Sequence, residues 1–187
     1  MQEREAINEI LVNINELPLD DTDVIEDINI AVVANTFLNV SRKEVLSYGW
    51  NFNSLTLNMY PNVSGYIIVP DSVLSIDPTA DTSTIITRDY KLYDNSTQSF
   101  QFTDSVECQI VDDIAFDDIP FVVANYIVKL AVLNTYSNQI GDAKGIDIRA
   151  NLLKLAKIEA YRDDANKHDG NILTSTFATT ALDRTSL

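Results

Sequence analysis

Residues 49–60 read Gly-Trp-Asn-Phe-Asn-Ser-Leu-Thr-Leu-Asn-Met-Tyr and mark the point where the hydrophobic period of the chain changes. Before this stretch apolar residues recur at helical spacing, and after it they form short segments separated by Pro, Gly, Asn and Asp. Six segments are β-rich: Leu55–Tyr60, Gly65–Pro70, Val73–Asp77, Thr84–Tyr93, Ser99–Phe102 and Val106–Val111. We therefore expect one antiparallel sheet inserted between helices.

Helical spacing flanks the β-rich region on both sides. Helices are expected over residues 2–15, from the capping residues 21–23 to about Tyr48, after Pro120 to about Gln139, and over about 142–166. The expected core stripes are Ala6, Ile7, Ile10, Leu11 and Ile14; Val24, Ile28, Ala31, Leu38 and Val45; Val123, Ile127 and Leu130; and Ile148, Leu152, Leu155 and Ala156. The sequence predicts an α+β fold, in which two N-terminal and two C-terminal helices form an antiparallel bundle with an inserted antiparallel β-sheet domain.

Composition divides the chain into four regions. Residues 1–49 supply the N-terminal helices, 50–115 the inserted β domain and 116–166 the C-terminal helices. Residues 167–187 are rich in Thr, Ser and Asn with scattered apolar residues, a composition typical of a flexible arm that becomes ordered on binding a partner.

The chain is strongly acidic, with a formal net charge of −15. Residues 1–128 hold 21 acids against 5 bases, whereas residues 129–187 hold 7 acids against 8 bases. Such a balance argues against general nucleic-acid binding, because phosphate affinity comes from Lys and Arg. The N-terminus lacks a secretory pattern, and the apolar run Phe121–Leu133 is shorter than the roughly 20 residues that a bilayer span needs, so we expect neither export nor a membrane span.

The residues with chemical potential do not form a reactive constellation. Cys108 has acidic neighbours that raise a thiol pKa, and as the single cysteine it suits a reducing cytoplasm. His168, the single histidine, begins the polar arm. The acid pairs 20–21, 112–113 and 117–118 lack the spacing of a calcium loop, and no phosphate-binding, hydrolase or metalloprotease motif occurs. We expect no catalytic residue, metal or cofactor, although a hydrolase acting through clustered carboxylates stays an alternative.

Four short motifs, in order, resemble those of the tail tubular protein A family of short-tailed bacteriophages. The first is Gly49-Trp50-Asn51-Phe52-Asn53, and the second runs from Tyr66 through Pro70 and Val73 to Asp77. The third is Lys91-Leu92-Tyr93-Asp94, and the fourth is Phe116-Asp117-Asp118-Ile119-Pro120. Core and turn roles are expected for the motif residues Gly49, Trp50, Phe52, Tyr66, Pro70, Asp77, Leu92, Tyr93, Asp94, Phe116 and Pro120.

This resemblance implies a structural protein of the virion tail, assembled in the host cytoplasm. The resemblance also implies a twelve-fold ring that bridges the portal to the nozzle, tail tubular protein B. Such a ring would extend the channel through which DNA leaves without being bound specifically. A receptor- or carbohydrate-binding tail accessory module is the alternative, and it would need exposed aromatic residues in a groove.

Ring assembly suggests roles for the charged residues. Two clusters, Glu16–Asp27 and Asp104–Asp118, each contain six acids and no base. Their members Asp20, Asp21, Asp112, Asp113, Asp117 and Asp118 either line the lumen, where carboxylates repel DNA phosphates, or lie in solvated loops on the outside. In the last helix, Lys154, Lys157 and Arg162, together with Lys144 and Arg149, are candidate contacts with a neighbouring subunit or the portal.

Overall fold

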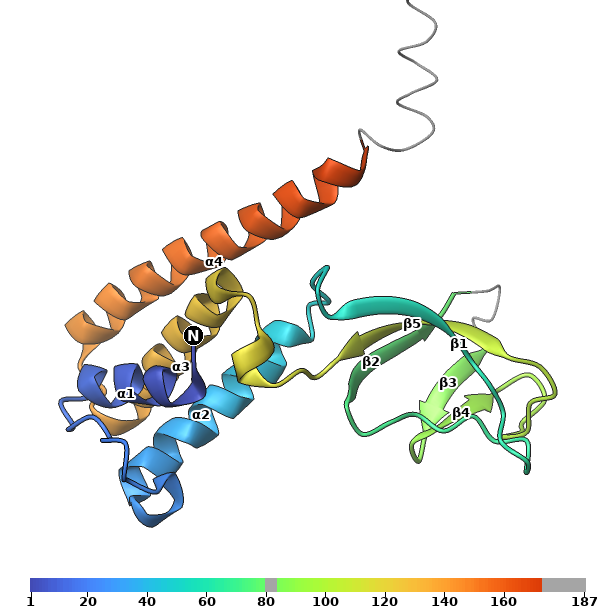
Figure 1. Cartoon of the computed structure of the whole chain (residues 1–187), viewed down its shortest axis with the longest axis horizontal. Coiled ribbons are helices and arrows are strands. Elements are labelled where there is room, and N and C mark those ends of the chain that lie inside the picture. The colour runs from blue at the N-terminus through green and yellow to red at the C-terminus, as the bar shows by residue number, and fades with distance from the viewer. Residues whose placement is uncertain (80–83, 173–187) are drawn as a thin grey trace, which may run out of the picture. The chain divides into compact units, whose positions relative to one another are not determined.

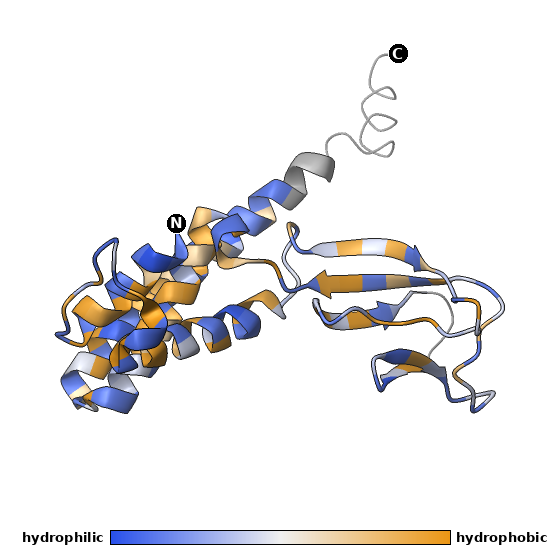
Figure 2. Ribbon diagram, turned by 60° about the horizontal axis from the view of Figure 1, so that its bottom comes forward, coloured by the Kyte–Doolittle hydropathy of each residue, from blue (hydrophilic) through white to orange (hydrophobic). Residues whose placement is uncertain are grey.

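The computed structural model describes residues 1–79 and 84–172 and shows an α+β protein (Figure 1). The elements in chain order are α1 (Glu3–Asn13), the 3₁₀ turn η1 (Ile25–Asp27), α2 (Asn29–Leu46), β1 (Ser54–Met59), β2 (Val73–Pro78), β3 (Ile85–Arg88), β4 (Lys91–Asp94), β5 (Val106–Asp112), the 3₁₀ turn η2 (Phe116–Asp118), α3 (Phe121–Gln139) and α4 (Ala143–Ile172). Apolar and polar residues alternate along β1 and along most of β5, and Figure 2 colours each residue by its hydropathy. None of the helices in the described part of the chain combines the length and apolar character of a membrane span.

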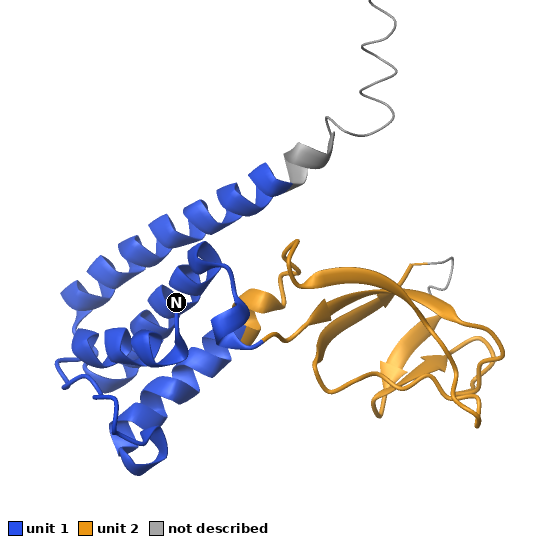
Figure 3. Cartoon of the chain, viewed as in Figure 1, with its two compact units in different colours: residues 1–42, 115–187 blue, residues 43–114 orange. Residues whose placement is uncertain are grey.

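The chain divides into two compact units (Figure 3). Unit 1 consists of residues 1–42 and 115–187, and unit 2 consists of residues 43–114. The boundary falls within α2, so the last turn of this helix belongs to unit 2.

Helix α3 forms the centre of unit 1. It packs against both α1 and α4, and its apolar residues face several directions, so that Ile127 and Val128 are both fully buried. Two polar interactions hold neighbouring helices to each other. The Lys129 ammonium of α3 pairs with the Glu9 carboxylate of α1, and the Arg149 guanidinium of α4 donates to the Asn13 carbonyl at the end of α1.

Helix α4 packs through small residues rather than through its large apolar ones. Gly145, Ala156 and Ala160 are buried. The predicted core residues Ile148, Leu152 and Leu155 are instead 52%, 46% and 65% exposed, so this prediction was wrong for all three. The reason is that small side chains let α4 approach α3 closely, which leaves the large apolar face of α4 on the outside. The helix also extends to Ile172, beyond the start of the expected arm, and residues 173–187 lie outside the described residues.

Helix α2 begins later than the sequence suggested. Its first residue is Asn29, because the chain makes the turn η1 just before it. Val24 therefore precedes the helix and is 51% exposed, contrary to its predicted place in the core stripe. Ala31, Leu38 and Val45 are buried as predicted.

Unit 2 contains a three-stranded antiparallel sheet of order β1-β5-β2 and a separate hairpin, β3-β4. The prediction of a single sheet was wrong, as was that of one continuous strand over Thr84–Tyr93. Asp89 and Tyr90 have left-handed φ angles of 50° and 55°, which fold this segment into a two-residue hairpin turn. The segments Gly65–Pro70 and Ser99–Phe102 contribute only isolated bridges. The core of unit 2 contains Met59, Ile67, Val69, Leu92, Val106, Cys108 and Ile110.

Candidate assembly surfaces

The first motif connects the end of α2 to β1 within unit 2. Trp50 is fully buried, and its indole Nε1 donates to the Val45 carbonyl at 2.7 Å. The half-buried ring of Phe52 stacks on Trp50, with centroids 6.4 Å apart. Gly49 has a φ of +80°, and a Cβ added there would lie 3.0 Å from the Ser54 hydroxyl oxygen. Gly49 therefore supplies a backbone conformation and a close approach that other residues would strain.

Asn53, the last residue of this motif, has a structural role that sequence reasoning missed. It is 1% exposed, and its Oδ1 accepts from the Trp50 amide at 2.8 Å. Its Nδ2 donates to the carbonyls of Leu46 and Asp112, at 3.1 and 2.9 Å. The side chain thus joins the end of α2 to the end of β5. An Asn directly after Phe52, at the junction of two periodicities, was the available signal.

The second motif lies partly in the core of unit 2 and partly at its surface. Ile67 is buried, whereas Tyr66 is half-buried beneath the Lys91 ammonium, which lies 5.0 Å from the centre of its ring. Pro70 and Asp77 are exposed, Asp77 within β2.

The third motif forms a strand and the turn that follows it. Leu92 is fully buried in the core of unit 2. The Asp94 carboxylate accepts from the Ser96 amide and hydroxyl at 2.8 and 2.6 Å and from the Thr97 hydroxyl at 2.9 Å. These hydrogen bonds, chiefly those from Ser96, lower the pKa of Asp94 from its usual 3.8 to about 2. The turn brings Tyr93 and Phe100 together, with ring centroids 4.8 Å apart.

The fourth motif belongs to unit 1. Phe116 is buried, and Pro120 occupies the N-cap position of α3, where its carbonyl accepts from the Val123 and Ala124 amides at 2.9 Å. The Asp117 carboxylate accepts from the Glu3 amide at 2.7 Å. Asp117 therefore satisfies a free N–H group at the start of α1, where the helix dipole favours a negative charge.

Acids from both sequence clusters meet around the start of α1. Asp117 contacts Glu3, while the Arg4 guanidinium donates to the backbone carbonyls of Asp20 and Asp23. We call this group the α1 acidic cluster; it contains Glu3, Glu5, Asp20, Asp21, Asp23, Asp117 and Asp118.

The carboxylates within this cluster differ in what they do. Asp20 accepts from the Thr22 hydroxyl and amide, at 2.7 and 2.8 Å, and these bonds lower the pKa of Asp20. Asp21 and Asp118 are exposed.

Asp112 and Asp113, which were candidates for either the lumen or the outer surface, belong to unit 2. The Asp113 carboxylate lies 3.9 Å from the Lys43 ammonium. The second acidic sequence cluster, Asp104–Asp118, is thus divided between the two units.

The described residues contain no grouping of three or more His, Cys, Asp or Glu that suits a metal ion. Cys108 is fully buried in β5. Burial, followed by the charges of Asp77 and Glu107, raises the pKa of its thiol, which opposes a nucleophilic role. His168 belongs to α4, and its side chain lies outside the described part.

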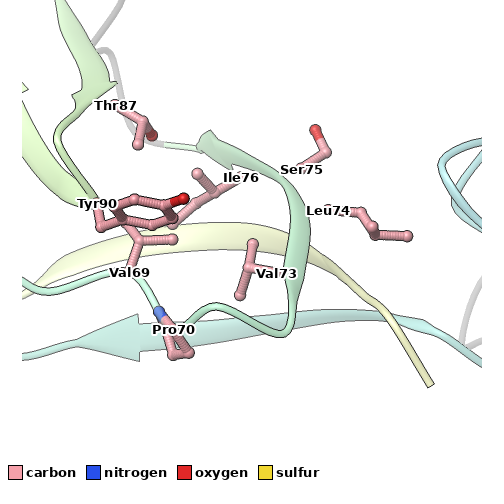
Figure 4. Close-up of a pocket in the computed structure, with 8 residues that line it drawn as sticks. All are labelled: Val69, Pro70, Val73, Leu74, Ser75, Ile76, Thr87 and Tyr90. Atoms are coloured by element: carbon pink, nitrogen blue, oxygen red, sulfur yellow. The ribbon is translucent and has the colours of Figure 1, made fainter. Parts of the chain in front are cut away.

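A pocket of about 280 Å³ opens beside the edge strand β2 (Figure 4). Its lining residues are Val69, Pro70, Val73, Leu74, Ser75, Ile76, Thr87 and Tyr90. The lining offers one aromatic ring and three hydroxyl groups, those of Ser75, Thr87 and Tyr90, but neither a carboxylate nor an amide side chain. The polar groups that could orient a sugar are therefore hydroxyls alone, so the pocket gives no specific support to the carbohydrate-binding alternative.

The basic residues expected to contact partners lie on α4. Lys154, Lys157 and Arg162 are all exposed. Lys154 and Lys157 border a shallow apolar depression with Ile158 and Tyr161, and the Lys157 ammonium lies 5.6 Å from the centre of the Tyr161 ring. Arg149 serves the interior of unit 1 instead, because its guanidinium stacks 3.5 Å from the ring centre of Tyr136.

A helical unit that exposes a row of large apolar residues, joined to a small β unit, is typical of proteins that bury further surface on assembly. Comparison with known proteins identifies the family to which the chain belongs. The family model described as Tube, tail tubular protein, matches residues 4–169, and the chain therefore belongs to the tail tubular protein family. The chain is also 30% identical over 141 residues to tail tubular protein A of Klebsiella phage KP34, a match that covers 75% of each chain. The protein is a structural component of a bacteriophage tail.

Proposed function

We propose that this protein forms an adaptor ring between the portal and the tail nozzle and extends the channel through which the genome leaves. The observation that carries the proposal is the family match, which runs through both units rather than through one of them. The similar protein of phage KP34 bears the name tail tubular protein A, and head-to-tail contacts between copies of one chain form a ring when the rotation between them closes.

The exposed apolar face of α4 supports the assembly part of this proposal. Soluble monomers rarely leave a contiguous row of large apolar side chains in water, and such rows mark contact sites. Within each subunit, the helices of unit 1 form the expected antiparallel bundle. This bundle supplies the contacts to neighbouring subunits of the ring. The portal and the nozzle bind at the two rims of the ring.

The acidity of the chain suits a channel for DNA. Carboxylates repel the phosphate groups of DNA, so a channel wall lined by them has little affinity for the duplex. The genome can then slide through without being bound. We propose that the α1 acidic cluster faces this channel, because it collects acids from three segments of unit 1 around a single exposed helix end.

Electron microscopy of the purified protein mixed with its cognate portal tests the function. The expected image is a closed ring docked on the narrow end of the portal, with twelve subunits. Portals that stay bare, or that carry the protein only as separate subunits, would contradict the adaptor role. Portal incubated with a tail protein of a different family provides the control for unspecific decoration.

A further inference from the structure

The outer face of α4 is the largest feature of unit 1 that its own packing does not explain. Ile148, Leu152, Leu155 and Ile158 follow one another at spacings of three and four residues, and each is between 46% and 65% exposed. A helix at the surface of a monomer normally turns charged and polar residues to water at such positions. The row therefore needs a partner.

Helix α2 presents a second uncharged face in the same unit. Residues 28–41 contain no charged side chain. Val32 and Val40 are 40% and 55% exposed, and Thr36 between them is also exposed. The opposite face of α2 packs inward through Ala34 and Leu38.

These two faces lie on different sides of unit 1. Helix α3 packs against α4, and the Asn134 amide of α3 donates to the Ser41 hydroxyl of α2 at 3.5 Å. In Figure 1, α2 and α4 accordingly flank α3. A contact that joins one face to a different face can repeat from subunit to subunit, and it closes a ring where the rotation between neighbouring subunits allows closure.

The charges at the start of α2 are complementary to those beside the α4 row. The exposed Glu26 and Asp27 immediately precede α2 at the Val32 end of its face, whereas the exposed Lys43 follows Val40 at the other end. The exposed Lys154 and Lys157 lie beside the apolar row on α4. Contact of the Lys154–Lys157 stretch with the start of α2 brings opposite charges together, whereas its contact with the same stretch of another α4 brings lysines together, and like charges oppose association.

We propose that the outer face of α4, formed by Ile148, Leu152, Leu155 and Ile158, packs against the Val32, Thr36 and Val40 face of α2 in a neighbouring copy of this chain. This interface rests on the ring function proposed above and names the surfaces that build the ring.

Two substitutions at exposed positions, Leu155→Glu on α4 and Val40→Glu on α2, test the pairing. Each places a carboxylate in the interface, so each alone should weaken self-association by at least about a hundredfold. An equimolar mixture of the two variants retains one intact pairing, between α4 of the V40E chain and α2 of the L155E chain. The mixture should therefore form a one-to-one heterodimer and no ring. Native mass spectrometry, with and without cognate portal, distinguishes these species.

Val12→Glu is the matched control, because Val12 is 56% exposed on α1 of the same unit and lies outside both faces. This variant should form rings like the unsubstituted chain. Circular dichroism and thermal unfolding of all three variants verify that each monomer is folded.

The outcomes separate this interface from the function. If both the unsubstituted chain and the V40E variant form rings, the proposed contact through α2 is wrong, whereas the adaptor function is unaffected. Loss of association in both single variants without heterodimer formation in the mixture would also overturn the pairing. Absence of rings from the unsubstituted chain, both alone and on the portal, would overturn the adaptor function itself.

Discussion

An apolar side chain at position 53 would remove one hydrogen bond from each of three backbone groups, the Trp50 N–H and the carbonyls of Leu46 and Asp112. The Asn53 amide group bonds all three in the vicinity of the buried Trp50. Unpaired polar groups are costly when buried, because water cannot replace the lost bond. The side chain therefore determines how the chain enters and leaves the β unit.

Asn53→Ala should lower the free energy of unfolding by about 3 kcal/mol, since it removes two buried hydrogen bonds and one that is partly buried. Urea unfolding followed by tryptophan fluorescence measures the change. Asn58→Ala, at an exposed position of β1, is the matched control and should change stability by less than about 0.5 kcal/mol. Equal losses in both variants would show that the Asn53 bonds carry no special weight.

Asp94 makes the turn after β4 sensitive to acid. Its folded-state pKa of about 2 lies below the usual 3.8, so its carboxylate stabilises the fold fully above the usual value. That contribution is lost as the pH falls through about 2. Asp94→Asn should therefore lower the melting temperature near neutral pH, and the gap to the unsubstituted chain should narrow between pH 4 and about 2.

Thermal unfolding across this pH range checks the prediction. Asp71→Asn removes an exposed carboxylate from the same unit and serves as the control for the change in net charge. A gap between the Asp94 variant and the unsubstituted chain that stays constant down to pH 2 would exclude the proposed role of the carboxylate.

At the scale of elements, hydrophobic periodicity predicted the buried residues where one face of an element is buried. It failed to predict structure that depends on local backbone geometry or on close packing. The buried residues Ala6, Ile7 and Ile10 of α1 follow from spacing alone. Spacing did not predict the hairpin turn at Asp89 and Tyr90, because neither residue is the Gly that usually marks left-handed backbone.

Helix α4 shows a second limit of periodicity. Its apolar row is regular, yet the row is exposed and the small residues on the other face are buried. A sequence pattern cannot distinguish an apolar row that packs within the subunit from one that packs against another subunit, because the spacing of apolar residues is the same in both cases.

Gly145 decides how closely α4 approaches α3. A Cβ at this position would lie 2.1 Å from the Tyr136 hydroxyl oxygen and 2.5 Å from the adjoining ring carbon. Overpacking costs about 1–3 kcal/mol, whereas Ala gains about 1 kcal/mol over Gly within a helix. Because Tyr136 is buried beneath Arg149, we expect the clash to dominate and Gly145→Ala to destabilise the protein.

The effect of Gly145→Ala on stability should change from destabilising to stabilising when the aromatic ring of Tyr136 is removed. In a Tyr136→Ala background the clash is absent, so adding Gly145→Ala should raise stability by its helix propensity. A double-mutant cycle by chemical denaturation measures both steps. If Gly145→Ala had the same effect in both backgrounds, the two residues would not be coupled.

At the scale of the whole molecule, the sequence indicated that acids are concentrated but not how they are grouped. Asp112 and Asp117 are close in sequence, yet the structure assigns them to different units. Asp117 and Asp20 are far apart in sequence, yet both belong to the cluster around the start of α1. Such grouping depends on tertiary contacts between α1, its following loop and η2, which no local pattern encodes.

If the α1 acidic cluster faces the channel, reversing its charge should make the ring hold DNA. Asp21 and Asp118 are suitable positions because both are exposed, whereas Asp20 and Asp117 also stabilise local structure. Rings of Asp21→Lys/Asp118→Lys should retain short duplex DNA at low ionic strength and release it as salt rises, since lysines displace phosphate counterions. Asp71→Lys/Asp104→Lys changes the net charge equally at exposed positions of unit 2. An electrophoretic assay in which both double variants retain DNA alike would assign the effect to net charge and reject the acidic channel wall.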